Sequence, residues 1–132
     1  MNTAATVKQI FRDYLKDRFG QDAKELKIYI CGLELQICGG ILKFEDELDI
    51  TLMSHDLRFT GYEYSEHKCM LPEMCVPFPE NTAVLISCIY SYRFEEICAK
   101  LETLGISKER MVHARPLAEK LLNISAEYFS QG

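Results

Sequence analysis

Residues 83–113 constrain the fold most, because they predict a strand, a helix and a strand in direct succession. Residues 83–89 (AVLISCI) are continuously apolar, which is typical of a strand buried on both faces of a sheet. We expect Ser91 to cap the following helix. The apolar stripe of that helix consists of Phe94, Ile97, Cys98, Leu101 and Leu104. With a short strand at 111–113, this order favours parallel pairing through a right-handed crossover.

The rest of the chain continues the alternation. We predict a helix over 4–19, a strand over 27–31 (KIYIC), a short helix over 33–42, a strand over 49–53 (DITLM) and a final helix opened by Pro116. Within 33–42, Gly39 and Gly40 weaken a helix and equally suit the turn of a hairpin; we favour the helix. Residues 54–81 are predicted to be mostly loop, with a brief strand at 74–76.

These elements predict one α/β domain over residues 1–132, a length usual for a single domain. It comprises an amphipathic helix in 1–20, a sheet core in 27–113 and a C-terminal helix in 114–130. Strands separated by helices imply a mostly parallel sheet of four to five strands with helices on both faces.

Charge narrows the classes of partner. The net charge is −5, and residues 27–82 hold ten acidic but only four basic side chains. This balance argues against a nucleic-acid backbone or an anionic membrane as partner. Charged residues interrupt the first twenty positions, and no apolar run approaches the roughly 20 residues of a membrane span. We therefore expect a cytoplasmic protein whose six cysteines are free thiols.

The carboxyl ends of the predicted strands are the candidate binding positions, because ligands of open parallel sheets bind there. Three places result. The first is the turn Gly32, Leu33 and Glu34, the second is Asp56, and the third is Ser91, Tyr92 and Arg93.

Each place has a functional and a structural interpretation. The turn fails the G-x-G-x-x-G fingerprint, because Glu34 and Ile37 stand where the later glycines belong. His55 and Asp56 together follow the second strand, and Asp56 is either a ribose ligand or a loop aspartate. Arg93 is a cation at a helix N-terminus, where the dipole disfavours it, so it is either an anion ligand or an exposed arginine.

Two further patterns are set aside. Tyr64 and Lys68 have the Y-x-x-x-K spacing of short-chain dehydrogenases but fall in a predicted loop. His67, Cys69 and Cys75 match no standard zinc-ligand spacing. We predict no catalytic residue and no metal site, and the sequence names no cofactor.

Residues 27–112 resemble the Rossmann-like domain that precedes the catalytic part of many sugar O-acyltransferases and of epimerase-type proteins of polysaccharide biosynthesis. The matching segments are KIYICG (27–32), DITLMSHD (49–56), Gly61 with LPE (71–73), and NTAVLISCIYSYRFEEICAKLETLGISKERMV (81–112). The resemblance implies a three-layer α/β/α fold that binds a nucleotide or nucleotide-sugar around Gly32, Asp56 and Ser91.

The leading hypothesis is therefore a non-catalytic nucleotide- or nucleotide-sugar-binding accessory domain linked to glycan biosynthesis. The alternative is a protein-interaction module that keeps the fold without a ligand site. The apolar stripe from Val7 to Leu15 would then pair with a partner protein or a second copy of the chain.

Overall fold

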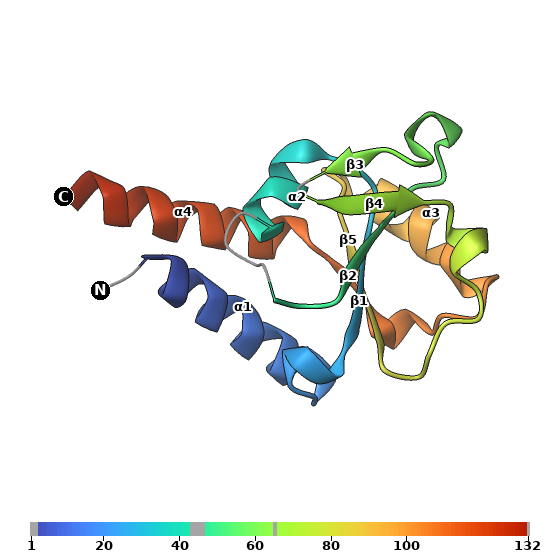
Figure 1. Ribbon diagram of the computed structural model, residues 1–132, viewed down its shortest axis with the longest axis horizontal. Helices are drawn as coiled ribbons and strands as arrows, with labels where there is room; N and C mark the ends of the chain where they lie inside the picture. The colour runs from blue at the N-terminus through green and yellow to red at the C-terminus, as the bar shows by residue number, and fades with distance from the viewer. Residues whose placement is uncertain (1–2, 43–46, 65, 132) are drawn as a thin grey trace.

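A computed structural model describes residues 3–42, 47–64 and 66–131. These residues form one six-stranded sheet in the order β3-β4-β2-β1-β5-β6, in which β3 is antiparallel to β4 and the other pairs are parallel (Figure 1). The strands are β1 (Lys27–Cys31), β2 (Ile50–Met53), β3 (Glu63–Tyr64), β4 (His67–Met70), β5 (Thr82–Ile86) and β6 (Met111–His113). The α-helices are α1 (Thr3–Phe19), α2 (Leu35–Leu42), α3 (Ser91–Glu102) and α4 (Arg115–Gln131).

Each face of the sheet has its own apolar core. Ile28 and Ile30 of β1 belong to a core shared with α1, α2 and α4. Tyr29 and Cys31 alternate with them and belong to a second core, shared with α3. This alternation is the two-residue period of a strand, and it explains why β1 and β5 are almost wholly apolar. The predicted α/β class with a mostly parallel sheet is confirmed.

The N-terminal helix is part of the core. Val7, Phe11 and Leu15 are 3%, 1% and 0% exposed, and they pack in the core that α4 also lines. The stripe that suggested a partner is therefore covered by the chain itself.

Gly39 and Gly40 lie inside α2 and neither break it nor turn a hairpin. A Cβ on Gly40 would lie 3.3 Å from both the Cβ and the carbonyl oxygen of Ala118 in α4. A Cβ on Gly39 would lie 3.0 Å from the hydroxyl of Tyr64. Gly40 thus lets α2 approach α4 closely, and Gly39 leaves room for Tyr64 of β3.

Residues 54–81, which were predicted to be mostly loop, contain the strands β3 and β4 in the structure. The strand predicted at 74–76 is wrong, because Pro72–Cys75 forms a short 3₁₀ helix, η3. Instead β4 pairs with β2, matching Leu52 with Cys69, and the short β3 extends the edge. The sheet consequently has six strands among the described residues, where four to five were predicted.

All six cysteines are free thiols, as predicted. Among the described residues, no helix combines the length and the apolar character needed to cross a membrane.

Candidate functional site at the carboxyl edge

The strand order reverses between β1 and β5, the position where open parallel sheets bind their ligands. Here the main chains of the two strand ends touch. Ser87 N–H donates to the Cys31 carbonyl at 2.8 Å, and a Cβ on Gly32 would lie 2.5 Å from the Ser87 carbonyl oxygen. Gly32 also has φ +96°, a conformation that favours glycine. The absence of a side chain at Gly32 therefore allows the two strand ends to come into contact.

The turn after Gly32 is occupied by its own side chains. One carboxylate oxygen of Glu34 accepts the Ile37 N–H at 2.9 Å, which caps the start of α2. The Ser87 hydroxyl donates to the Glu34 carbonyl at 3.1 Å, and Leu33 packs against the core. Glu34 therefore stands where a phosphate would meet this helix, in agreement with the failed glycine fingerprint.

Asp56 follows β2 and is held by Arg58. Its carboxylate accepts from Arg58 Nε at 3.0 Å, Arg58 Nη2 at 2.6 Å and the Arg58 backbone N–H at 3.0 Å. The hydrogen bonds from the Arg58 side chain, then those from its backbone, lower the pKa of Asp56 to about 2. Asp56 is thus ionised over the whole physiological range.

His55, also at the end of β2, carries an unpartnered atom. Its Nε2 is buried and has no hydrogen-bond partner in the part of the chain that the structure describes. Burial lowers the pKa of His55, and the positive charges of Lys100 and Arg93 lower it further, whereas the negative charge of Glu73 raises it. The net lowering favours the neutral imidazole. The sequence showed a polar residue after a strand but could not show this missing partner.

The third predicted place lies at the start of α3, on the other face of the sheet from α2. Tyr90, and not Ser91, is the N-cap residue, and it makes no side-chain cap. Tyr90 and Tyr92 stack at 5.5 Å with their rings 58% and 62% exposed. Arg93 pairs with Glu96 at 2.7 Å. Among the described residues, no hydrogen bond or ion pair joins Asp56 or Arg93 to the Gly32 turn.

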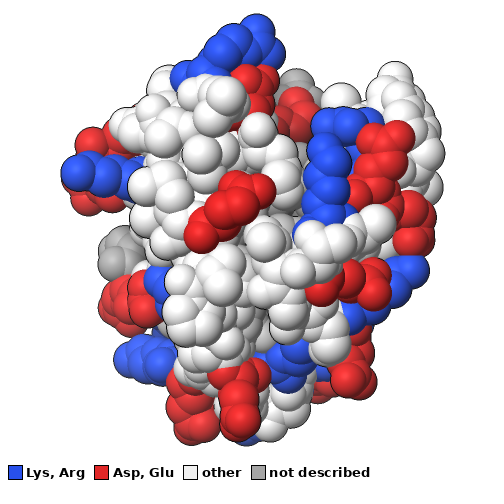
Figure 2. All heavy atoms as spheres, turned by 90° about the vertical axis from the view of Figure 1, so that its right-hand side faces the viewer, with Lys and Arg blue, Asp and Glu red and all other residues white. Residues whose placement is uncertain are grey.

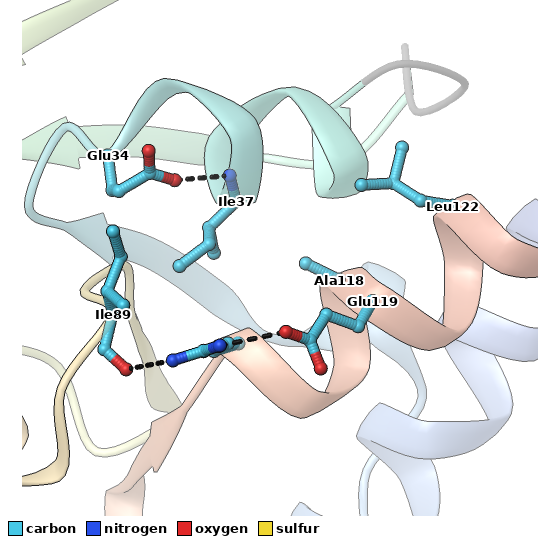
Figure 3. Close-up of a pocket in the computed structure, with 7 residues that line it drawn as sticks. Glu34, Ile37, Ile89, Ala118, Glu119 and Leu122 are labelled. Carbon is cyan, nitrogen blue, oxygen red and sulfur yellow. Dashed lines mark hydrogen bonds and ion pairs between the residues drawn. The ribbon is translucent and has the colours of Figure 1, made fainter.

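A cavity of about 120 Å³ opens between α2, the segment after β5 and α4 (Figure 3). Its lining residues are Glu34, Ile37, Ile89, Arg115, Ala118, Glu119 and Leu122. Such a volume is below the roughly 300 Å³ at which pockets for whole small molecules begin. The cavity therefore has room for part of a ligand only.

A cysteine and a histidine that the sequence analysis did not pair also meet at this edge. His113 Nε2 lies 2.8 Å from the Cys88 carbonyl oxygen and 3.7 Å from Cys88 Sγ, and its ring stacks on Phe94. Burial raises the pKa of Cys88, which disfavours the thiolate that a nucleophile needs. This geometry suits a structural contact.

The fold gives the patterns set aside earlier structural positions. Tyr64 on β3 pairs with His67 and Lys68 on β4 pairs with Glu63, so Tyr64 and Lys68 lie on opposite faces of the paired strands. His67 Nδ1 bonds to the Ile50 carbonyl, and Cys75 Sγ donates to that of Leu71. No group of His, Cys, Asp or Glu within the described ranges has the arrangement of a metal site.

Comparison of the chain with protein-family models, curated proteins and solved structures finds no match.

Proposed function

We propose that this chain is a Rossmann-like, three-layer α/β/α module that binds a nucleotide or nucleotide-sugar without catalysing its reaction, in the context of glycan biosynthesis. Two features support the class of fold. Parallel strands run outward in both directions from β1, and helices cover both faces of the sheet. The resemblance of residues 27–112 supplies the ligand class.

The observation that carries the proposal is the buried, unpartnered Nε2 of His55. Buried polar atoms nearly always have a partner, so an orphan beside a strand's carboxyl end marks a place for a ligand atom. Asp56 follows His55 in the chain, and the charges that act on His55 are those of Lys100, Glu73 and Arg93, two of them positive. This side of the edge suits an anionic ligand better than the Gly32 turn, where Glu34 caps α2.

A binding role also agrees with the chemistry of the thiols. Burial raises the pKa of both Cys38 and Cys98 to about 11, so neither is poised as a nucleophile. The Cys88–His113 contact is held by a hydrogen bond that His113 Nε2 donates to the Cys88 carbonyl.

The test is titration of the full chain with UDP-glucose, NAD and S-adenosylmethionine, followed by thermal shift and calorimetry. We expect one of them to bind and His55→Phe to weaken binding by about three- to ten-fold, the range for one hydrogen bond. Folding stability should be unchanged or higher in this variant, because the substitution removes an unsatisfied buried atom. His67→Gln, which removes an imidazole from β4, is the control and should keep the affinity. Absence of any shift at millimolar ligand would refute the proposal.

A second candidate, a protein-interaction module, is favoured by exposed apolar side chains. Leu57, Met74 and Val76 are 74%, 58% and 45% exposed. Figure 2 shows the face on the right of Figure 1, where a broad, mostly uncharged area is interrupted by acidic side-chain atoms near its middle and bordered by charged side chains. Sedimentation over a range of concentrations tests whether a second copy covers these residues. Self-association that Leu57→Ser with Met74→Ser abolishes would support the contact, and a monomer at all concentrations would exclude it.

A further inference from the structure

The cavity of Figure 3 lies apart from the proposed nucleotide site. Its walls come from α2 and α4, which share one core, whereas His55 is influenced by charges on α3, across the sheet. The inference drawn from the cavity therefore does not depend on nucleotide binding.

Arg115 contributes a fixed, flat surface to this cavity. Its Nε donates to Glu119 at 2.8 Å and its Nη1 donates to the Ile89 carbonyl at 2.8 Å, as the dashed lines in Figure 3 show. Guanidinium N–H bonds lie in the plane of the group, so these two bonds fix the orientation of the plane and leave its face uncovered by them. That face stacks well on aromatic rings.

The other walls are apolar and the entrance is open. Ile37 and Ala118 are buried, while Ile89 and Leu122, 42% and 37% exposed, form the rim. An apolar cavity of about 150 Å³ is known to hold benzene. The present volume of about 120 Å³, open at the rim, accordingly suits one six-membered ring and not a purine or a whole nucleotide.

The charges of the residues that line the cavity indicate which kind of ring it favours. Two carboxylates, Glu34 and Glu119, and one guanidinium line the cavity, and Glu119 already pairs with Arg115. The surplus is negative, which disfavours a phosphate-bearing ring and favours a neutral ring with a cation beside it.

We propose that this cavity receives the aromatic side chain of a partner protein, a Phe or Tyr flanked by Lys or Arg, with the ring stacked on Arg115. The ring replaces water against Ile37, Ala118 and Leu122, and the flanking cation lies near Glu34. Aromatic anchors beside basic residues are common at the centres of protein interfaces.

The experiment uses the ¹⁵N-labelled full chain and capped tripeptides as probes. Lys-Phe-Lys is expected to shift the amide signals of Ile37, Ile89 and Ala118 with a Kd on the order of 1 mM, reasonable for one buried ring. Lys-Leu-Lys lacks the aromatic ring, and Glu-Phe-Glu reverses the flanking charge. Both should bind at least about three-fold more weakly than Lys-Phe-Lys.

Two variants test the proposed contacts. Arg115→Lys keeps the charge but loses the flat face, and should weaken Lys-Phe-Lys binding about three-fold or more with an unchanged melting temperature. Arg93→Lys is its matched control, since Arg93 forms the same kind of exposed pair with Glu96 on α3. Glu34→Gln keeps a cap acceptor and should reduce the preference for Lys-Phe-Lys over Glu-Phe-Glu.

Several outcomes would overturn the proposal. One is equal binding of the three peptides, and another is no shift in the lining residues at millimolar peptide. A third is stronger binding of uridine monophosphate at the same residues, which would assign the cavity to a nucleotide. A fourth is peptide-free shifts that grow with protein concentration, which would make a second copy of the chain the occupant.

Discussion

The ends of β1 and β5 can approach each other closely because Gly32 has no side chain. Its φ of +96° and the 2.5 Å approach of a built Cβ to the Ser87 carbonyl are two independent obstacles to any other residue. Because the obstructing atom is backbone, the strand ends would have to separate.

We therefore expect Gly32→Ala to lower the free energy of unfolding by about 3 kcal/mol or more, measured by urea denaturation. Gly61→Ala is the matched control. Gly61 has φ +81°, but its Cβ would meet nothing within 4 Å, so only the backbone strain of about 1 kcal/mol applies. Equal losses in the two variants would show that the contact with Ser87 contributes nothing.

Asp56 and Arg58 offer a test by titration. The hydrogen bonds from Arg58 lower the pKa of Asp56 from 3.8 to about 2. A lowered carboxyl pKa contributes stability that is present above 3.8 and is lost as the pH falls through about 2. NMR titration of the Asp56 carboxyl carbon should show this value, and Arg58→Gln should return it towards 3.8. An unchanged pKa in the variant would contradict the assignment.

At the residue scale, the sequence could predict where the candidate site residues lie, but not which of their side chains already have hydrogen-bond partners. Gly32 directly follows β1 and Asp56 follows β2, as expected from the sequence, whereas Arg93 lies in the first turn of α3, which is the helix after β5. That Asp56 is held by a residue two positions on, or that His55 Nε2 lacks a partner, depends on side-chain placement. Neither leaves a periodic trace in the sequence.

Among the elements, the packing of α2 on α4 depends on Gly40 in particular. A Cβ there would press on the Ala118 carbonyl, which is part of the α4 backbone. At Gly39 the obstacle is the Tyr64 hydroxyl, the far end of a side chain that can move.

Gly40→Ala should therefore destabilise the protein by about 1–3 kcal/mol despite its better helix propensity. Gly39→Ala should keep the wild-type stability or gain up to about 1 kcal/mol, because the propensity gain meets little resistance. Thermal and urea denaturation of the two variants measure the difference. A stabilised Gly40→Ala would mean that α2 and α4 are not in close contact.

Elements with a clear hydrophobic period were predicted well, and those without one were missed. The apolar runs of β1 and β5 and the stripe of α1 identified these elements because burial dictates their composition. In β4 only Cys69 is buried, so the strand has no apolar run that would identify it. Its pairing with β2 joins residues that are distant in the sequence. Where a strand was predicted at 74–76, Pro72 begins the 3₁₀ helix η3, which includes Met74 and Cys75.

For the whole molecule, the carboxyl edge of the sheet has two candidate sites. One includes His55, on which charges of α3 act, and the other is the cavity beside Arg115, which lies between α2 and α4. Because the nucleotides and the tripeptides probe different residues, one experiment can succeed where the other fails.

The unequal covering of the two faces of the sheet has a consequence for local opening. One face is covered by α1, α2 and α4, the other by α3 and the irregular segment that contributes Cys75 and Phe78. Removal of α3 would therefore leave the larger core intact, so α3 should detach before the rest unfolds. Native-state hydrogen exchange should show the amides of α3 opening at lower free energy than those of β1 and α1. Such a partly open form would expose the neighbourhood of His55 while the walls that α2 and α4 give to the cavity beside Arg115 stay in place.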